Sequence, residues 1–231
     1  NQTSFVYAYD KSGATVELAR LHGEEDRVWV DLDDMSPYLK EAFIALEDTR
    51  FMKHHGVDWI RTFGVIIKPK NIGQGGSTIT QQLIKNVTGN KEVTVQRKLI
   101  EIFQALEFEK KYDKDEILEW YLNAVYFGEG CDGIYTAAEK YFGKEPSELT
   151  LAESASIVGI VNLPTYYSPF YSEENNKERQ ETVLRRMYEL GFISYDEYKQ
   201  AKDEELVFTR SENEVATQEI YSYYVEAVIA D

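Results

Sequence analysis

The sequence has a single cysteine, no long apolar run and too few basic residues to balance its acids. Each shortage excludes a class of protein. Cys131 is the only cysteine among 231 residues, so a disulfide framework is excluded and we expect a free, packed thiol. No run of eighteen or more apolar residues occurs, so no segment has the pattern of a membrane span. The formal charge of −16 argues against nucleic-acid binding.

Several catalytic signatures are also missing. The sequence contains no GxSxG elbow, no Walker A loop and no GxGxxG motif. Nucleophilic hydrolase, NTPase and dinucleotide-binding functions therefore have no motif to support them. The chain begins at Asn1 without an initiator Met or a signal peptide, and we interpret it as a fragment of something longer. Its 43% hydrophobic residues suffice for one large domain, or two lobes that share a core.

The charge is unevenly distributed. Residues 61–100 hold seven basic residues and one acid, a local charge of +6 that leaves −22 on the rest of the chain. A cationic segment in an acidic protein predicts a docking place for an anionic ligand or an anionic membrane surface. The alternative is chance clustering on a solvated face.

The stretch 74–86 concentrates ligand-binding groups at one expected helix start. Two glycines allow a tight approach, and Ser77 or Thr78 can cap the helix. We expect an apolar seam on this helix (Ile79, Leu83, Val87) and an opposite polar surface (Ser77, Thr80, Gln81, Lys85). Free backbone N–H groups, hydroxyls, amides and an ammonium would then face a phosphorylated, sugar-bearing ligand. An ordinary capped amphipathic helix is the alternative.

Most of the remaining pattern predicts helices. Residues 4–10 and 15–32 alternate and predict a small β-hairpin. Helices are expected at 36–47 (inward Leu39, Phe43, Leu46), 94–111 (inward Leu99, Ile102, Phe103, Leu106), 114–127, 133–141 and 173–190, with capping boxes at Thr150–Glu153 and Ser194–Glu197. Residues 64–76 contain four glycines and Pro69 and predict a loop. The expected fold class is mainly α.

Two carboxylates have contrasting surroundings. Glu47 lies where an apolar helix face meets a polar turn, and partial burial there would make it a usable general base. Glu101 shares a helix surface with Arg97 and Lys98, where it would stay ionised, orient the cations or hold a divalent ion. Such a pair suits the cutting or making of a glycosidic bond. A surface acid and an intrahelical ion pair are the alternatives.

His54 and His55 are adjacent, without the spacing of a metal site. We expect a histidine here to orient a neighbouring loop by hydrogen bonding.

Four motifs occur in order along the chain. They are Glu47-Asp48-x-x-Phe51-x-x-His54-x-Gly56, Gly75-Gly76-Ser77-Thr78-Ile79-Thr80-Gln81-Gln82-x-x-Lys85-Asn86, Arg97-Lys98-x-x-Glu101 and Lys114-x-x-Ile117-Leu118-x-x-Tyr121-Leu122-Asn123. This order resembles the signature of the peptidoglycan glycosyltransferases (glycosyltransferase family 51), the domain of class A penicillin-binding proteins and monofunctional transglycosylases. The resemblance covers about residues 36–205.

The resemblance implies a lysozyme-like, two-lobed fold with a head and a smaller membrane-dipping jaw, the latter around residues 64–76. It also implies polymerisation of lipid II. The acceptor's 4-hydroxyl attacks the anomeric carbon of the growing chain's muramic acid, with inversion to a β-1,4 link and release of undecaprenyl pyrophosphate. A phosphoglycolipid inhibitor such as moenomycin would occupy the same cleft.

By motif position, the resemblance makes Glu47 the general base, and Glu101 the group that assists pyrophosphate departure, with a divalent metal (Mg or Mn) as an optional cofactor. It makes Lys85, Arg97 and Lys98 the diphosphate clamp. The other implied substrate-binding residues are Asp48, Phe51, His54, Gly76, Ser77, Thr80, Gln81, Gln82 and Asn86. The family often has Arg or Lys where this chain has Val93, so one diphosphate contact is expected to be weaker or rerouted.

The expected organisation is an N-terminal β segment (1–35), the glycosyltransferase domain (36–205) and a linker (206–231). The expected partners are lipid II, the growing glycan chain and the outer leaflet of a bacterial cytoplasmic membrane, together with cell-wall synthesis proteins. We expect a transmembrane helix before Asn1 and a transpeptidase domain after Asp231, with this chain on the extracytoplasmic face. A lysozyme-like lytic enzyme is the first competing function, although a hydrolase has no diphosphate to hold. A non-catalytic glycan-binding or scaffold domain, for which Glu47 would be dispensable, is the second.

Overall fold

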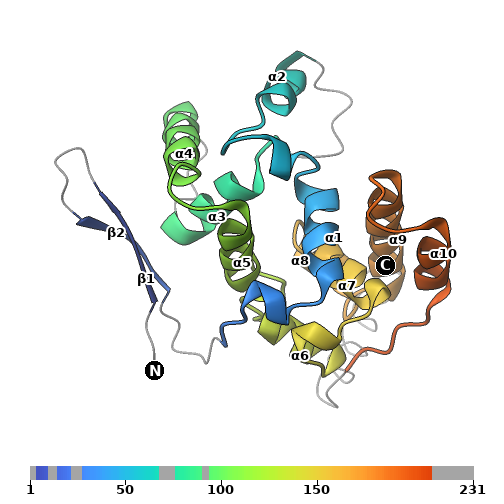
Figure 1. The fold of residues 1–231 in the computed structure, drawn as a ribbon. Coiled ribbons are helices and arrows are strands. Elements are labelled where there is room, and N and C mark those ends of the chain that lie inside the picture. The colour runs from blue at the N-terminus through green and yellow to red at the C-terminus, as the bar shows by residue number, and fades with distance from the viewer. Residues whose placement is uncertain (1–3, 10–14, 22–27, 68–75, 90–93, 210–231) are drawn as a thin grey trace, which may run out of the picture.

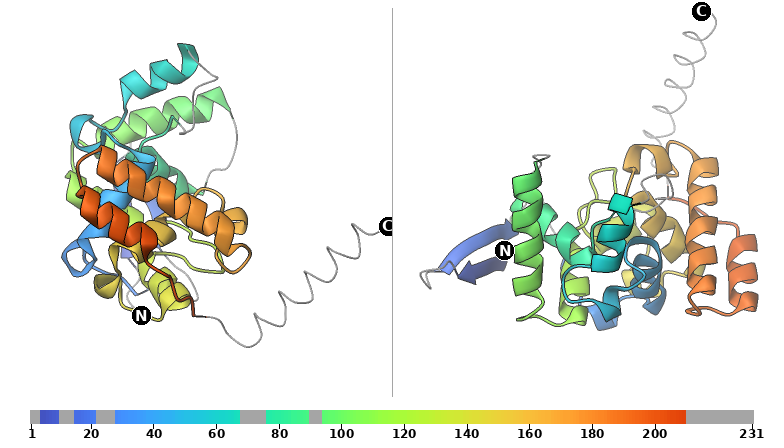
Figure 2. Two further views of the ribbon diagram at one scale, coloured as in Figure 1. Left: turned by 90° about the vertical axis from the view of Figure 1, so that its right-hand side faces the viewer. Right: turned by 90° about the horizontal axis from the view of Figure 1, so that it is seen from above.

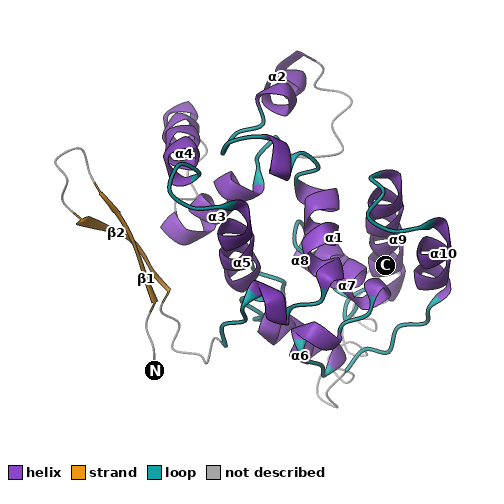
Figure 3. Cartoon of the chain, viewed as in Figure 1, coloured by secondary structure: helices purple, strands orange, loops and turns teal. Residues whose placement is uncertain are grey.

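Helices make up most of the part of the chain that the structure describes. The computed structural model describes residues 4–9, 15–21, 28–67, 76–89 and 94–209. In chain order the elements are β1 (Ser4–Tyr9), β2 (Thr15–Leu21), η1 (Leu32–Asp34), α1 (Pro37–Glu47), η2 (Phe51–Lys53), α2 (Trp59–Ile67), α3 (Ile79–Thr88), α4 (Val95–Phe108), α5 (Lys114–Ala124), α6 (Ile134–Phe142), η4 (Pro146–Glu148), α7 (Leu151–Ile160), α8 (Pro164–Tyr167), α9 (Glu173–Glu189) and α10 (Tyr195–Asp203) (Figures 1 and 3). The expected mainly α class is confirmed.

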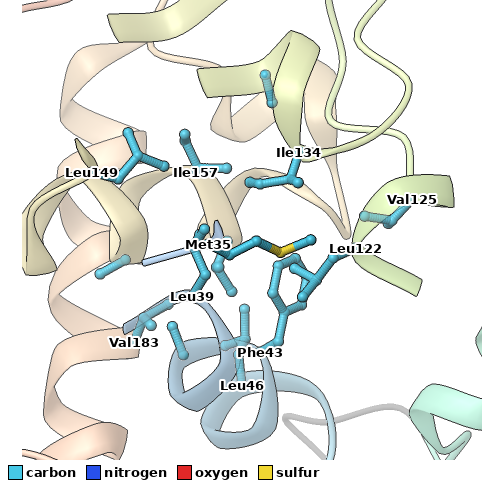
Figure 4. Packing of buried hydrophobic residues seen from close by; sticks show 14 of the residues in the cluster. Met35, Leu39, Phe43, Leu46, Leu122, Val125, Ile134, Leu149, Ile157 and Val183 are labelled. Atoms are coloured by element: carbon cyan, nitrogen blue, oxygen red, sulfur yellow. The ribbon is translucent and has the colours of Figure 1, made fainter. Parts of the chain in front are cut away.

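Helix α1 lies at the centre of the hydrophobic core. The predicted inward residues Leu39, Phe43 and Leu46 are all buried, and α1 packs against α7 and α9 (Figure 4). The Phe43 ring meets the ring of Tyr121 edge to face at 5.4 Å, which joins α1 to α5. The end of α1 is therefore held rigidly, and that end carries Glu47.

All of the residues of helix α7 are buried. Its predicted capping box is present, because Thr150 accepts from the Glu153 backbone N–H and Glu153 accepts from that of Thr150. Pro164 begins α8 shortly afterwards, so the short connection between α7 and α8 is held at both ends.

Helix α3 packs between α4 and α5. Of the two candidate caps, Thr78 is the one used, in a capping box with Gln81. Ile79 and Leu83 are buried as predicted, and Gly89 ends the helix in the left-handed conformation. The two views of Figure 2 show α4 beside α3 along one side of the molecule.

Strands β1 and β2 pair antiparallel, from Ser4 opposite Leu21 to Tyr9 opposite Thr15. The expected turn between them lies outside the described residues, as does the Val93 position. Near the other terminus, the Phe208 ring packs on the ring of Phe142 at 5.2 Å. The expected linker from residue 206 therefore starts with packed residues, and most of it (210–231) lies outside the described part.

The prediction of a loop across residues 64–76 is wrong at its start. Helix α2 continues through Ile67, and residues 68–75 lie outside the described part. The glycine that suggested a loop, Gly64, is accommodated inside the helix, where its cost of about 1 kcal/mol is small beside helix packing.

The predicted buried row of α4 is wrong for two of its four residues. Leu99 and Phe103 are 51% and 66% exposed, whereas Ile102 and Leu106 are partly buried. The buried positions are instead Glu101 and Ala105. The reason is a close backbone approach at Ala105, which only a small side chain allows, together with ion pairs that hold Glu101 inward.

Candidate active site

Glu47 lies at the last position of α1, and its side chain is buried. Both carboxylate oxygens accept a hydrogen bond from an amide: Oε2 from Gln82 Nε2 at 2.9 Å, and Oε1 from Asn162 Nδ2 at 2.6 Å. A carboxylate oxygen can accept more than one hydrogen bond. The two amide donors thus hold the Glu47 carboxylate in one position, and further lone pairs are left for a substrate proton.

Tyr121 of α5 holds the Gln82 side chain that bonds Glu47. Its hydroxyl donates to Gln82 Oε1 at 3.1 Å, so the Gln82 amide nitrogen is the atom that points at Glu47. Burial raises the pKa of Tyr121 well above its ordinary value, and the charges of Glu47 and Asp48 add to the shift. The phenol therefore remains a donor.

Two arginines bind the end of the α1 backbone. Arg61 of α2 donates to the Glu47 carbonyl oxygen, and Arg186 of α9 donates to the Leu46 carbonyl oxygen at 3.1 Å. These carbonyls are among those that a helix C-terminus leaves unpaired. Burial lowers the pKa of Arg186, Arg179 adds to that shift, and Glu47 opposes it.

Glu101 is buried in α4, and it forms the ion pairs that its sequence position predicted. Arg97 donates to Glu101 Oε2 at 2.6 Å and Lys98 donates to Oε1. Lys98 also donates to Ser77 Oγ at 2.8 Å, which ties α4 to the start of α3. Each cation is only partly buried, so each retains a side that faces solvent.

Helix α3 connects the two carboxylates. Glu47 bonds Gln82, and the Lys98 partner of Glu101 bonds Ser77 at the helix start. Lys85 follows Gln82 by one turn and is exposed. Helix α3 thus has the buried Glu47 carboxylate bonded to its Gln82, Lys98 of α4 bonded at its start, and its own Lys85 exposed.

Five of the predicted substrate-binding residues lie in the interior: Asp48, Phe51, His54, Thr80 and Gln81. Asp48 Oδ2 accepts from the Ile79 backbone N–H at 3.0 Å and lies 2.9 Å from His54 Nε2. Through this contact we expect His54 to orient the neighbouring part of the chain.

Glu109 completes the interior group and was not predicted. It accepts from Thr80 Oγ1 and from Lys114 Nζ, the latter at 2.6 Å. The Lys114 ammonium also lies 4.3 Å from the centre of the Phe51 ring. Burial lowers the pKa of Lys114, and its bond to Glu109 opposes that shift. These contacts fix the segment after Glu47 against α3 and α5.

Two expectations for α3 need correction. Thr80 and Gln81 are buried, so they do not share an exposed surface with Lys85. The first backbone N–H groups of the helix are also occupied. Thr78, Ile79 and Gln81 donate to side chains of the protein itself, so these N–H groups do not offer a phosphate site.

The remaining predicted site residues reach the surface to some extent: Gly76, Ser77, Gln82, Lys85, Asn86, Arg97 and Lys98. The sequence pattern did not single out Asn162 or Tyr121 as parts of the site. Tyr121 occurs in the fourth motif but had the pattern of a core residue. Asn162 lies in the connection between α7 and α8, where the sequence has no motif or periodicity. No local signal could therefore have identified it as a site residue.

The predicted metal position depends on the two carboxylate oxygens of Glu101 as ligands. Both Glu101 oxygens are bonded to cations, and the described residues include no group of three His, Cys, Asp or Glu side chains suited to a metal ion. These side chains alone do not complete a divalent-ion site among the described residues, so a metal at Glu101 stays a prediction. Cys131 is a buried thiol, as expected of the single cysteine.

Comparisons with known proteins agree with the motif pattern. A family model described as "Transglycosylase" matches residues 14–188. Penicillin-binding protein 1A/1B of Bacillus subtilis is 40% identical over 231 residues, covering 96% of this chain and 25% of that protein. Penicillin-binding protein 1A of Escherichia coli is 39% identical over 228 residues, covering 93% of this chain and 27% of that protein.

The crystal structure of Penicillin-Binding Protein 1A from Haemophilus influenzae is similar, with a TM-score of 0.50 and 26% identity. The match covers 97% of this chain and 25% of that one. The chain thus spans about a quarter of the length of these relatives.

Proposed function

This chain belongs to the transglycosylase family, and from that premise we propose that it is a peptidoglycan glycosyltransferase that polymerises lipid II into β-1,4 glycan strands. In this reaction the 4-hydroxyl of an acceptor N-acetylglucosamine attacks the anomeric carbon of the growing chain's muramic acid. The configuration inverts, and undecaprenyl pyrophosphate leaves. The reaction needs a base at the hydroxyl and positive charge at the leaving group.

The observation that carries the proposal is the arrangement along α3. Glu47 is buried and both oxygens accept from amides, which suits a group that must accept the acceptor's proton. Lys98 contacts the start of the same helix, and Lys85 is exposed on it. Arg97, Lys98 and Lys85 would stabilise the departing diphosphate. The charge of +6 on residues 61–100 agrees with an anionic leaving group at this place.

Glu101 would act on the leaving group through the cations that it holds. Its carboxylate keeps Arg97 and Lys98 side by side. A divalent ion bound at Glu101 stays a prediction, and no step here is routed through it. The interior residues Asp48 and His54 would support the site by fixing the chain after Glu47.

A membrane surface is the proposed setting. Helix α4 exposes Val95, Leu99, Ile100 and Phe103, and α2 exposes Trp59 and Ile60. Figure 1 shows α2 and α4 at the same end of the molecule. Contiguous apolar exposure of this kind suits contact with lipid, where the undecaprenyl chain resides. This end would be the jaw of a two-lobed, lysozyme-like fold. No helix among the described residues is long and apolar enough to cross a bilayer.

The test uses labelled lipid II. The wild-type chain should form glycan polymer, and Glu47→Gln should lower the rate roughly a thousand-fold, equivalent to about 4 kcal/mol of barrier. Thermal unfolding of the variant should stay close to wild type, because Gln keeps the size of the side chain. An unchanged polymerisation rate would refute the role of Glu47.

A lytic enzyme is the alternative function, and the same purified protein can be assayed for it. Purified sacculi would release muropeptides if the chain cleaved glycan, and no polymer would form from lipid II. The pairing of Glu101 with two cations favours synthesis, because a hydrolase of polymeric glycan has no diphosphate to stabilise.

A further inference from the structure

We propose that Asn162 is a positioning residue for the proposed glycosyl transfer: it holds the Glu47 carboxylate correctly aimed from the connection between α7 and α8. The inference rests on the proposed function. It adds a residue that lies 115 positions from Glu47 and outside all four sequence motifs.

The geometry gives Asn162 one particular task. Its Nδ2 donates to Glu47 Oε1 at 2.6 Å, whereas Gln82 serves the other oxygen at 2.9 Å. Two donors on two oxygens fix both the position and the rotation of the carboxylate plane. Gln82 is in turn held by Tyr121, but the side chain of Asn162 is exposed. Asn162 therefore bonds Glu47 on the solvent side, where a substrate hydroxyl would arrive.

The connection that carries Asn162 is short and anchored. Helix α7 ends at Ile160 in the core, and α8 begins at Pro164, whose ring fixes its backbone φ. Asn162 lies between these two points, so the packed helices on either side fix the position of its backbone. A donor on such a support limits the movement of Glu47 more than a donor on a long loop would.

Three charged groups and one buried phenol lie around Glu47. Arg61 of α2 and Arg186 of α9 bond the α1 backbone beside it, Asp48 follows it in the chain, and Tyr121 of α5 bonds its partner Gln82. Among the side chains bonded to the Glu47 carboxylate itself, Asn162 and Gln82 are the donors that the structure shows. Loss of the Asn162 donor should therefore make the carboxylate easier to protonate.

The experiment measures the pH–rate profile of lipid II polymerisation for wild type, Asn162→Ala and Asn162→Asp. In Asn162→Ala the acidic limb should move up by about half to one pH unit, as expected for one lost hydrogen bond to a charged group. On this limb the rate at a given pH should fall about three- to tenfold, and it should recover as the pH rises. Asn162→Asp should shift the limb further, because it adds a second carboxylate beside Glu47.

A merely structural role would instead lower the rate equally at every pH, and this result would overturn the proposal. The matched control is Asn175→Ala. Asn175 donates its amide to the Tyr166 carbonyl oxygen in α8 but does not bond Glu47. Its profile should equal that of wild type.

A second measurement needs no substrate. In protein labelled with ¹³C at glutamate carboxyl carbons, the signal of Glu47 is identified by its absence in Glu47→Gln. Its titration midpoint should be higher in Asn162→Ala than in wild type, and equal midpoints would refute the inference. Absence of polymer from the wild type, with shifted midpoints, would contradict only the proposed function.

Discussion

The backbone of Gly56 lies directly against that of Ala105. A Cβ on Gly56 would lie 2.4 Å from the Ala105 carbonyl oxygen, and Gly56 has a φ of +81°. This approach brings the segment after Glu47 against α4, where Glu101 holds its cations. It also explains why a small residue, and not one of the large apolar residues, occupies the buried face of α4.

Gly56→Ala should lower the free energy of unfolding by about 3 kcal/mol, because it combines a left-handed backbone with overlap against fixed backbone atoms. Gly191→Ala is the matched control. Gly191 has a φ of +75° but no atom within 4 Å of an added Cβ, so about 1 kcal/mol of strain is expected. Urea unfolding checks both, and equal losses would contradict the close approach.

Lys98→Ala should lower polymerisation about a hundred-fold, because one cation at the departing diphosphate is lost. Glu101 keeps Arg97 as a partner, so the protein should remain folded. Initial rates with labelled lipid II measure the effect. Lys110→Ala provides the comparison, since Lys110 forms an exposed pair with Glu107 and should change the rate less than twofold. A normal rate in Lys98→Ala would remove this residue from the clamp.

Phe103→Glu should weaken binding to vesicles of mixed anionic and neutral phospholipid about tenfold or more, because burying one large apolar side chain stabilises binding by about 1.5–3 kcal/mol. Phe103 is 66% exposed, so the folding stability should hardly change. Co-sedimentation measures the binding. Tyr195→Glu on α10 alters an equally exposed residue away from α4 and should bind as wild type does. Equal binding by the two variants would argue against α4 as the lipid-facing element.

Glu41→Gln should stabilise the protein at pH 7 but not at pH 3.5. Burial raises the pKa of Glu41, the charge of Glu197 adds to the shift, and Lys40 opposes it. A raised pKa means that the folded state disfavours the charged form. The charged Glu41 side chain therefore lowers the free energy of unfolding above its pKa in the folded state. This destabilisation disappears below the ordinary pKa of 4.5.

Because Glu41 is only partly buried, solvent screens its charge and the gain should stay below about 1 kcal/mol. Thermal unfolding at the two pH values measures it. Glu107→Gln is the control, because Glu107 forms only an exposed pair with Lys110 and should show no comparable gain. A gain of equal size at pH 3.5 would show that repacking, and not charge, is responsible.

Local pattern predicted those parts of the fold that depend on neighbours within two turns. The inward face of α1, the capping boxes of α7 and α10, and the ion pairs of Glu101 all involve residues three to seven positions apart. The predicted row of α4 failed at Leu99 and Phe103, because hydrophobic spacing finds an apolar face without revealing what covers it.

By itself the sequence determined the helical class, the ordered motifs and the cationic segment, because these depend on spacing and composition alone. Only the tertiary structure decided that Glu47 would meet Gln82 and Asn162, across separations of 35 and 115 residues. It also decided that Asp48 and Thr80 would lie in the interior while Lys85 remains at the surface. Such partners are chosen by the packing of whole helices around α1 and α3, and no local periodicity encodes that packing.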